Sequence, residues 1–431
     1  MKSCNCTLLA VMAAAFCGGS CRGADFYVDR AVGDAANPGT AELPWSSLKE
    51  AFAGGRLKAG DTLYLRSGDY GSVSVSGSNA DFVTIEAIAG HEIRISSIRI
   101  RNARFWRIRG LTISAEFAEP YRRQALIDIG RDASDISIEG CKLYSAKDIS
   151  HWSAGDWVAR SCFGIVVNGT RVRIEGNHLL NVDHGISVTG THNVVAGNTI
   201  ENFSGDGIRA LGDDCVYRRN VIKNCYKVDD NHDDGIQSWS MGPGGVGTGV
   251  VKNVIIDGNL IINTSDPDQK FRGTLQGIGC FDGMFENWLI VNNVIVVDHF
   301  HGISLYGAKN CRILNNTVVD NRRGRPGPPW IMITKHKKGM AGAGNVIRNN
   351  LTERPISPAG AEYVDHNVVI TDVEMFFADY GGFDFRLRPG VAAIDAGSTE
   401  GITATDFLGN PRVSGRTVDA GAIEYSGAAK H

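Results

Sequence analysis

The sequence predicts an all-β fold, a right-handed parallel β-helix, and three observations favour it. An eight-residue pattern, x-x-apolar-x-Ile-x-(Gly/Asn)-Asn, recurs along the middle of the chain. Its closest spacings are 21, 22 and 23 residues, and such a period with one strand-like segment per repeat is typical of a solenoid. A second repeated strand and a glycine excess (53 Gly against 12 Pro) suit short strands joined by tight turns. The pattern occupies 134–141, 170–177, 191–198, 213–220, 252–259, 286–293, 309–316 and 343–350.

The last position of this pattern predicts a ladder of hydrogen-bonded asparagines. Identical turns stacked in register place these side chains one above another, so each amide can bond to the next. A leucine-rich solenoid is the structural rival, but its leucine spacing is missing from the chain. The position holds Cys141, Asn177, Asn198, Asn220, Asn259, Asn293, Asn316 and Asn350.

Residues 1–23 have the pattern of a signal peptide. Lys2 precedes an apolar run at 8–17, and small residues follow. The run is too short to span a bilayer, and no later stretch is a transmembrane candidate. We therefore expect a secreted or periplasmic protein. Lipoprotein cleavage before Cys17 or Cys21 is an alternative, although neither cysteine has the usual leucine three places upstream.

The remaining chain is expected to form one body. Residues 24–360 are expected to form the parallel β-helix with its loop insertions, and 361–431 its closing segment. Strands are expected at 26–29 and 60–65. Between them, 44–53 predicts an amphipathic helix that caps the open end of the coil, where strand edges would otherwise be unpaired.

Six cysteines follow the signal, and most of them fall at positions expected to face the interior. Buried small hydrophobic side chains are therefore the preferred interpretation. A Cys215–Cys225 disulfide is an alternative in an exported protein. No cysteine spacing predicts a zinc site.

The second repeated strand, aligned by its Gly-Ile, predicts the face that carries the chemistry. Side chains alternate across a strand, and the inward positions here are apolar and small. The outward positions are ionisable or aromatic, a mixture that a sheet facing only solvent would not need. The residue before each glycine is Phe163, His184, Asp206, Asp234, Gln276 or His301, and neighbouring outward positions add Arg209, Gln237, Trp239, Phe281 and Tyr306.

Loop insertions are expected to border this face on both sides. From ladder asparagine to Gly-Ile strand, the short turns take 8 or 9 residues and the long ones 15, 18 and 23. These insertions and 317–329 enter at one corner, whereas 240–251 leaves at the opposite edge. A groove with a basic wall and an aromatic floor suits an anionic polymer with flat sugar faces. The loop cations are Lys270, Arg272, Arg322, Arg323 and Arg325, and Lys335, His336, Lys337 and Lys338 follow the strand beyond them.

Acidic residues concentrate at 229–239, where four carboxylates and a histidine lie within six positions. Asp206 and Asp234 should be one turn apart, about 4.8 Å, and such a coupled pair tends to share a proton. His184 and His301 are expected above and below them. So many like charges need an offsetting cation. Ca²⁺ is one option, with Asp229, Asp230 and Asp233 as oxygen ligands.

Several segments resemble known proteins. The run 47–62 resembles the opening of many secreted bacterial β-helix proteins, and 394–397 with 418–425 resembles their closing segment. At the groove, the chain is similar to alginate lyases and mannuronan C5-epimerases. The epimerases carry Asp-Pro-His-Asp or Asp-Pro-His-Glu there, and this chain has 230–233, Asp-Asn-His-Asp. The resemblance implies that His232 exchanges the sugar proton and that Asp230 and Asp233 are the motif acids.

The favoured function is a polysaccharide lyase acting on an anionic, alginate-like glycan by β-elimination. Such an enzyme must neutralise the uronate carboxylate, remove the C5 proton and protonate the leaving oxygen. The expected base is His232 or Lys270. The expected neutraliser is Arg272 or Arg209, with Asp234 protonated, and the expected acid is Tyr306 or His301. Asp233 completes the candidate catalytic set, and His184, Asp206, Gln237, Trp239, Tyr306, His301, Arg322 and Arg323 are expected to bind substrate.

Three other functions remain open from the sequence. A C5-epimerase would use the same groove and reprotonate C5 from the other face. A glycoside hydrolase of polygalacturonase type would use carboxylate pairs drawn from Asp206, Asp233 and Asp234. A non-catalytic glycan-binding β-helix would keep the aromatic residues without needing His232. The net charge of −3 argues against a nucleic-acid partner, and a monomer is expected.

Overall fold

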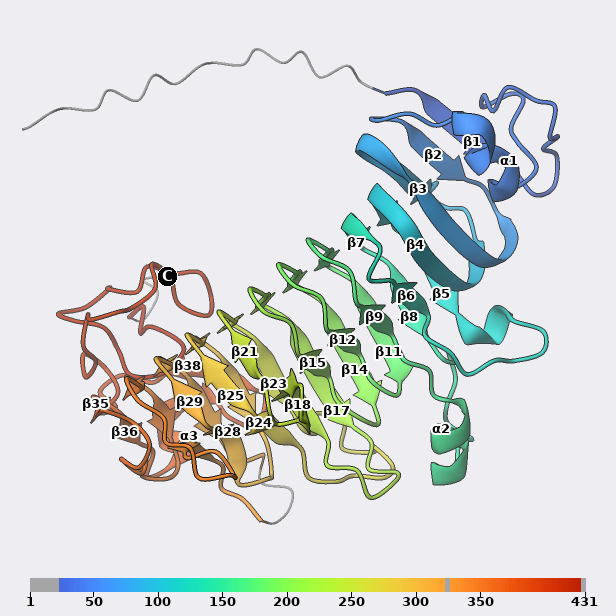
Figure 1. Ribbon diagram of the computed structural model, residues 1–431. Coiled ribbons are helices and arrows are strands. Elements are labelled where there is room, and N and C mark those ends of the chain that lie inside the picture. The colour runs from blue at the N-terminus through green and yellow to red at the C-terminus, as the bar shows by residue number, and fades with distance from the viewer. Residues whose placement is uncertain (1–22, 322–325, 428–431) are drawn as a thin grey trace, which may run out of the picture.

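A computed structural model describes residues 23–321 and 326–427 and shows a long parallel coil (Figure 1). The predicted export signal lies almost wholly outside the described residues. Each turn contributes one strand to each of three parallel ladders, which confirms the predicted β-helix. Among the described residues, no helix is long and apolar enough to cross a membrane.

The first ladder contains the Gly-Ile strands and carries the candidate site. Its strands pair in parallel from each turn to the next, and the isoleucines after the glycines align, as in Ile186, Ile208 and Ile236. The ladder consists of β6 (Ile127–Ile129), β9 (Ile165–Val167), β12 (Ile186–Val188), β15 (Ile208–Ala210), β18 (Asp234–Trp239), β24 (Gln276–Asp282), β28 (His301–Tyr306) and β32 (Trp330–Thr334).

The second ladder is formed by the strands of the eight-residue pattern. It consists of β7 (Ser134–Glu139), β10 (Arg173–Glu175), β13 (Val194–Ala196), β16 (Val216–Arg218), β22 (Ile255–Asp257), β26 (Leu289–Val291), β30 (Arg312–Leu314), β33 (Val346–Arg348) and β35 (Tyr363–Asp365).

The third ladder follows the asparagine of each pattern. It consists of β5 (Thr112–Ser114), β8 (Lys142–Tyr144), β11 (His178–Val182), β14 (Thr199–Phe203), β17 (Val221–Cys225), β23 (Leu260–Ile262), β27 (Val294–Val296), β31 (Thr317–Val319), β34 (Leu351–Thr352) and β36 (Val368–Val369).

The corner between the second and third ladders explains the end of the pattern. Its seventh residue has a positive φ in every turn, for example 64° at Gly197 and 58° at Asn292, and Gly and Asn adopt that conformation most readily. The asparagine that follows turns inward and bonds to the next turn. Asn198 Oδ1 accepts both Asn177 N–H (3.0 Å) and Asn177 Nδ2–H (2.9 Å), and the same pair of bonds links Asn198 to Asn220. The predicted ladder is confirmed.

The amino-terminal end is built from longer elements. They are β1 (Asp25–Val28), α1 (Leu48–Phe52), β2 (Thr62–Leu65), β3 (Gly68–Ala87) and β4 (Ile93–Arg109). The expected helix is shorter than 44–53, because Trp45 makes a parallel β-bridge with Val28 and Ser47 has an extended backbone. The apolar side of α1 packs as expected, with Leu48 and Ala51 buried.

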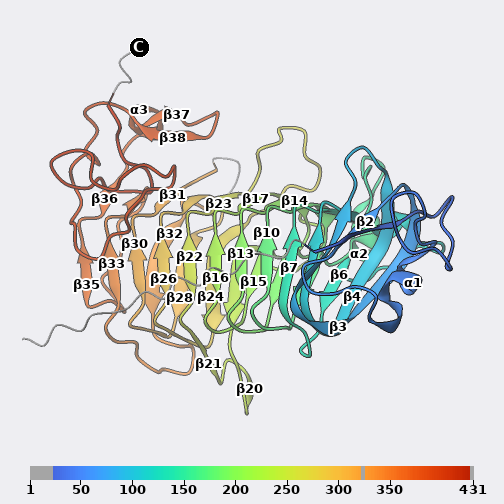
Figure 2. The ribbon, with the colours of Figure 1, turned by 90° about the horizontal axis from the view of Figure 1, so that it is seen from above.

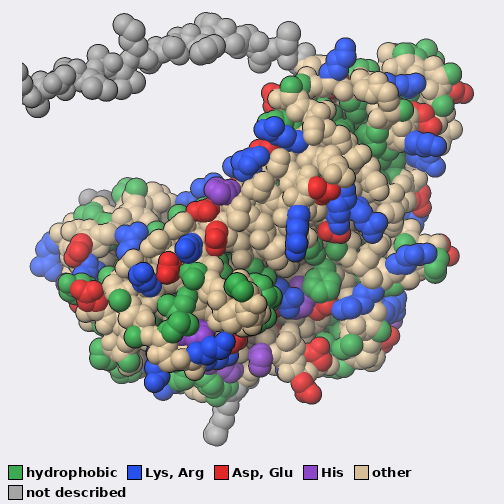
Figure 3. Space-filling model, viewed as in Figure 1, with side chains coloured by type: hydrophobic (Ala, Val, Ile, Leu, Met, Phe, Trp, Pro, Cys, Tyr) green, Lys and Arg blue, Asp and Glu red, His purple; other side chains and the backbone are tan. Residues whose placement is uncertain are grey.

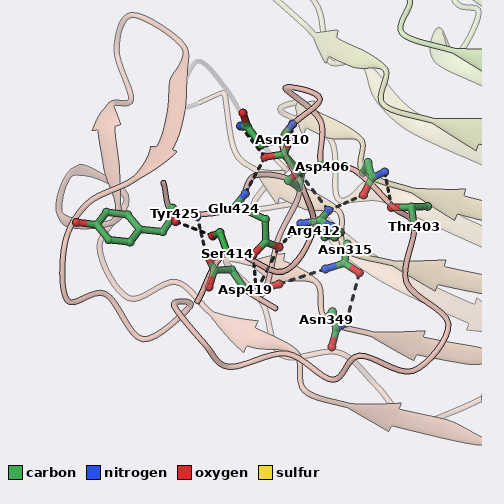
Figure 4. Close-up of polar contacts among 12 residues, drawn as sticks. Asn315, Asn349, Thr403, Asp406, Asn410, Arg412, Ser414, Asp419, Glu424 and Tyr425 are labelled. Carbon is green, nitrogen blue, oxygen red and sulfur yellow. Dashed lines mark hydrogen bonds and ion pairs between the residues drawn. The ribbon is translucent and has the colours of Figure 1, made fainter. Parts of the chain in front are cut away.

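The carboxyl-terminal segment folds against the last turns. It contains α3 (Val373–Phe376), β37 (Phe377–Asp379) and β38 (Asp384–Leu387), followed by irregular chain. A buried polar network ties it to the coil (Figure 4): Arg412 donates to Glu424 Oε1 (2.7 Å) and to Asn292, the residue before a ladder asparagine. Burial raises the pKa of Glu424 to about 7.

The interior of the coil is apolar, and the described cysteines belong to it. Cys141, Cys162, Cys215, Cys225, Cys280 and Cys311 are all free and buried. The alternative of a Cys215–Cys225 disulfide is therefore wrong.

Candidate functional site

Loops border both edges of the first ladder, as the insertions predict. The long connections from the third ladder to the first enter at one edge, and the hairpin of β19 (Met241–Gly242) and β20 (Gly245–Val246) projects from the other (Figure 2). Beyond the hairpin, a small parallel sheet extends the same edge; it comprises β21 (Val250–Lys252), β25 (Met284–Glu286) and β29 (Ala308–Lys309).

The long loops are fastened to one another by an aromatic cluster. The loop after β8 contains α2 (Ala154–Arg160), whose Trp157 ring lies 4.6 Å from Tyr226 of the loop after β17. Trp152 of the loop after β8 and Phe271 of the loop after β23 join the same cluster. Three insertions from different turns thus form one continuous wall.

The glycine of each Gly-Ile places the preceding side chain on the outer face. A Cβ added to Gly207 would lie 2.5 Å from Ile222 Cγ2, and one added to Gly235 would lie 2.5 Å from Ile261 Cγ2, so both glycines face the core. The isoleucines that follow are also buried, which breaks the strict alternation. Asp206 and Asp234 therefore lie on the outer face, as expected.

These two carboxylates are nevertheless buried, which the sequence did not indicate. Asp206 is 1 % exposed and Asp234 is 0 % exposed. Asp206 Oδ2 accepts a bond from Arg209 Nε (2.7 Å), and its Oδ1 accepts the backbone N–H of Asp234 (3.2 Å). In this structure Asp206 does not reach substrate and instead holds the Arg209 guanidinium, which stacks 5.4 Å above the Trp239 ring.

Asp234 is enclosed by the next turn of the first ladder. Its Oδ2 accepts Gln237 Nε2–H (2.9 Å), and its Oδ1 has no partner among the described residues. A Cβ on Gly279 would lie only 2.1 Å from that oxygen, so the carboxyl group occupies space that only glycine leaves. Burial, followed by the charge of Asp206, raises the pKa of Asp234 well above its usual range. The direction of this shift agrees with the protonated form expected for Asp234.

Two further ionisable groups lie beneath the face. His184 Nδ1 accepts the backbone N–H of Asp206 (2.7 Å), and burial lowers the pKa of His184 to about 3, so its ring is neutral. Asp233 is buried behind Lys227, 3.7 Å from its Nζ, and burial raises the pKa of Asp233 to about 8. Both residues shape the site from below.

A histidine and aromatic cluster covers the next turns. Phe281 lies 4.8 Å from the His301 ring and 5.2 Å from Tyr306, which bears out the predicted aromatic floor on that side. Trp330 Nε1–H donates to Ser304 Oγ (3.0 Å), and Ser304 Oγ lies 2.8 Å from His301 Nδ1. Trp330 Nε1–H also donates to His301 Nδ1 (3.3 Å), so Nδ1 is an acceptor and the neutral His301 ring carries its proton on Nε2.

Several predicted cations and ligands are not brought to the carboxylates. Lys270 Nζ donates to the Ser150 carbonyl in the α2 loop, and exposed Arg272 bonds to the Gln269 carbonyl. Both therefore bond to backbone carbonyls within the wall, where Phe271 between them packs in the aromatic cluster. Arg322, Arg323 and Arg325 lie outside the described residues.

The expected calcium ligands do not converge either. Asp229 Oδ1 accepts Asn231 N–H in its own turn (2.9 Å), Asp230 is exposed, and Asp233 faces Lys227. Among the described residues, no three His, Cys, Asp or Glu side chains are placed to hold a metal ion.

His232 is exposed on the wall loop, near enough to His299 for its charge to lower the pKa of His299, after burial, to about 4. His299 in turn stacks on His301 at 5.1 Å. Figure 3 shows several histidine side chains close together near the positions of β24 and β28 in Figure 1, with Lys and Arg beside them.

Sequence reasoning missed part of this cluster. His299 lies outside the aligned strand, and Trp330 belongs to a turn without Gly-Ile. Ser304 could have been found, because it occupies the same outward register as Arg209 and Gln237.

Comparisons with known proteins agree with the fold. A family model described as a right handed beta helix region matches residues 163–354. The structure of XylC in complex with xylose has a TM-score of 0.55 at 10% identity, covering 94% of this chain and 99% of that one. Pectate lyase Pel9A has a TM-score of 0.48 at 15% identity over 93% and 96%. The A-module of a mannuronan C-5 epimerase from Azotobacter vinelandii has 0.42 at 16% identity over 72% and 84%. These likenesses concern the fold alone.

Proposed function

We propose that the protein is a polysaccharide lyase that cleaves a uronate-containing, alginate-like glycan by β-elimination on the outer face of the first ladder. The observation that carries the proposal is the Arg209 guanidinium. Asp206 fixes it from below and Trp239 supports it, and the rings of Phe281 and His301 lie two and three turns further along the same ladder. A guanidinium so positioned suits the planar carboxylate of a uronate.

Arg209 is assigned to neutralising that carboxylate. The C5 proton of a uronate is acidified only by the neighbouring carboxylate, and negative charge builds there as the proton leaves. A fixed cation stabilises this charge without reorganising. Asp234 is assigned to the protonated form, so that it bonds to Gln237 and adds no second negative charge beneath Arg209. Asp206 and Asp234 act as positioning residues.

His232 is assigned as both the base and the acid. It is exposed on the wall loop, where an imidazole can take the C5 proton, and the resulting imidazolium returns that proton to the glycosidic oxygen as the C4–O bond breaks and the C4–C5 double bond forms. His301 and Tyr306, the acids expected from the sequence, lie on β28, three turns from Arg209 and about 14 Å along the face. They are therefore assigned to binding a neighbouring sugar.

Burial of the carboxylate pair disfavours a hydrolase. A glycosidase needs two carboxyl groups in contact with the glycosidic bond, whereas Asp206 and Asp234 are 1 % and 0 % exposed. The C5-epimerase remains the second candidate, because His232 belongs to the 230–233 motif that resembles the epimerases and both reactions begin with removal of the same proton.

Activity on polymannuronate, polyguluronate, pectate and glycosaminoglycans tests the proposal. We expect a rise in ultraviolet absorbance from unsaturated uronates on at least one polymer. New reducing ends without that rise would indicate a hydrolase, and altered uronate stereochemistry alone would indicate an epimerase. No change on any of them would contradict an enzyme of this class.

Substitution of Arg209 tests the assignment of the neutraliser. Arg209→Ala should lower kcat about 100-fold, the usual effect of losing one donor to a developing anion, and Arg209→Lys should restore only part of it. Arg218→Ala is the matched control, since exposed Arg218 lies on the second ladder. Equal activity of Arg209→Ala and wild type would remove Arg209 from the mechanism.

A further inference from the structure

A cavity of about 500 Å³ lies at the amino-terminal end of the first-ladder face. Its floor includes Ser72 of β3 and Ser96 and Arg99 of β4, and the loop after β5 closes it with Arg122 and Gln124. It is separate from the residues assigned to catalysis, and nothing in the proposed reaction uses it.

The strand register places this cavity in line with Arg209. Arg99 pairs with Asp128, Asp128 with Val166, Val166 with Ser187, and Ser187 with Arg209. Arg99 and Arg209 therefore occupy the same outward column, four turns apart. At about 4.8 Å per turn, the distance along the face is roughly 19 Å, a span of several sugar units.

The wall of the groove is continuous over this distance. Tyr121, in the loop that closes the cavity, donates its hydroxyl to the Arg160 carbonyl at the end of α2 (2.6 Å). Arg123 of the same loop donates to the Ser161 carbonyl (2.8 Å) and pairs with Asp183 (2.6 Å). The α2 loop then continues into the aromatic cluster that joins the wall beside Asp206.

Two guanidinium groups in the cavity are available to a ligand. Arg99 and Arg122 are exposed, and neither makes a side-chain ion pair with the described residues. Arg101, two residues along the same strand, is instead paired with Asp128. A free guanidinium binds a carboxylate with two parallel bonds. Glu119, Asp69 and Gln124 add acceptors for hydroxyl groups, a combination that matches a uronate better than a simple anion.

We infer that this cavity is a distal subsite for a uronate residue of a polymer lying along the first ladder, with Arg99 and Arg122 as its specificity residues. The inference rests on the proposed function and extends it, because it makes chain length a determinant of binding. A long polymer can contact Arg209 and the distal subsite at once, whereas a short oligomer at the catalytic residues cannot.

Kinetics on long and short substrates test the subsite. With the uronate polymer that the wild type cleaves, Arg99→Ala and Arg122→Ala should each raise KM about tenfold, and the double variant more, while kcat stays within twofold. With a trisaccharide of the same uronate, kcat/KM should not change. Arg218→Ala is the control on both substrates. An equal loss on polymer and trisaccharide, or no loss on either, would overturn the subsite.

Binding measurements separate this inference from the proposed function. If no polymer is cleaved, affinity electrophoresis of the full chain in gels containing polymannuronate, polyguluronate or pectate still measures binding of the polymer to the groove. Retardation that weakens in the double variant but not in Arg218→Ala would support the subsite without the lyase. Retardation that is equal in all three proteins would overturn the subsite, and no retardation of the wild type would overturn both.

Discussion

Glycine at position 279 shows how one residue controls the buried carboxyl group of Asp234. The glycine lies on the outer side of β24, directly over Asp234 Oδ1. A side chain there would have to displace either this oxygen or the Phe281 ring, which a Cβ would approach to 2.6 Å. The absence of a side chain is therefore what allows the carboxyl group to sit beneath the face.

We expect Gly279→Ala to destabilise the protein by about 1–3 kcal/mol, the usual range for overpacking a close-packed site. Its activity should also fall, because Asp234 holds Gln237 and its backbone N–H bonds to Asp206, which in turn holds Arg209. Thermal unfolding and turnover on the cleaved polymer are the measurements. Gly155→Ala in α2 is the control, since its added Cβ meets nothing closer than 3.7 Å. An unchanged midpoint for Gly279→Ala would mean that the Asp234 carboxyl group lies elsewhere.

At the scale of the element, the asparagine ladder joins each turn of the coil to the next. Asn198 takes part in four side-chain hydrogen bonds: two accepted from Asn177, one donated to the Ile174 carbonyl (2.8 Å) and one donated to Asn220 (3.0 Å). All of these groups are buried. Each buried polar group left without a partner costs about 1–3 kcal/mol, so loss of one asparagine from the ladder lowers the free energy of unfolding.

We expect Asn198→Ala to lower the free energy of unfolding by about 3 kcal/mol or more, measured by chemical denaturation. Asn168→Ala is the control, because Asn168 accepts a single exposed bond from Thr189, and we expect it to cost less than about 1 kcal/mol. Similar losses of unfolding free energy in the two variants would show that a ladder asparagine contributes no more to stability than an ordinary surface contact.

At the scale of the whole molecule, buried ionisable groups make stability depend on pH in two opposite ways. Burial lowers the pKa values of His184, His299 and His301 to about 3, 4 and 4, so the unfolded chain binds more protons below about 6.5, the ordinary value. Their contribution to stability is lost as pH falls through that window. Asp233 behaves in the opposite way: its folded pKa of about 8 exceeds its usual value, and its contribution is lost as pH rises from about 4 to 8.

We expect the free energy of unfolding to decrease between pH 7 and pH 8, a window above the ordinary pKa of the histidines, and Glu424, whose pKa is about 7, adds to the same decrease. Asp233→Asn should reduce this slope, because an amide does not titrate. Raised pKa values at Asp206 and Asp234 act in the same direction, so part of the slope should remain. Denaturation curves at several pH values measure it, and an identical slope in the variant would show that Asp233 titrates normally.

The sequence by itself determined the parts of this protein that repeat. The positions of the ladder asparagines from Asn177 to Asn350, the alignment of the Gly-Ile strands and the outward placement of Asp206 and Asp234 follow from short-range patterns, because each turn meets the next in the same register. The edges at which the insertions lie follow in the same way, since the long loops connect the third ladder to the first and the insertion 240–251 follows the first ladder. The structure adds Asn367 to the end of the ladder, where it accepts two bonds from Asn350.

Only the tertiary structure decided how deep each side chain lies and where the loops lead. Asp234 is buried because Gly279 of the next turn lies over it, and His184 because Gly205 of the next turn does, whereas Arg209 and Gln237 bond to Asp206 and Asp234 within their own turns. Lys270 is held on the wall because Phe271 packs with Trp152 and Trp157, which are more than a hundred residues away in the chain. Contacts between distant segments have no period, so no repeat in the sequence reports them.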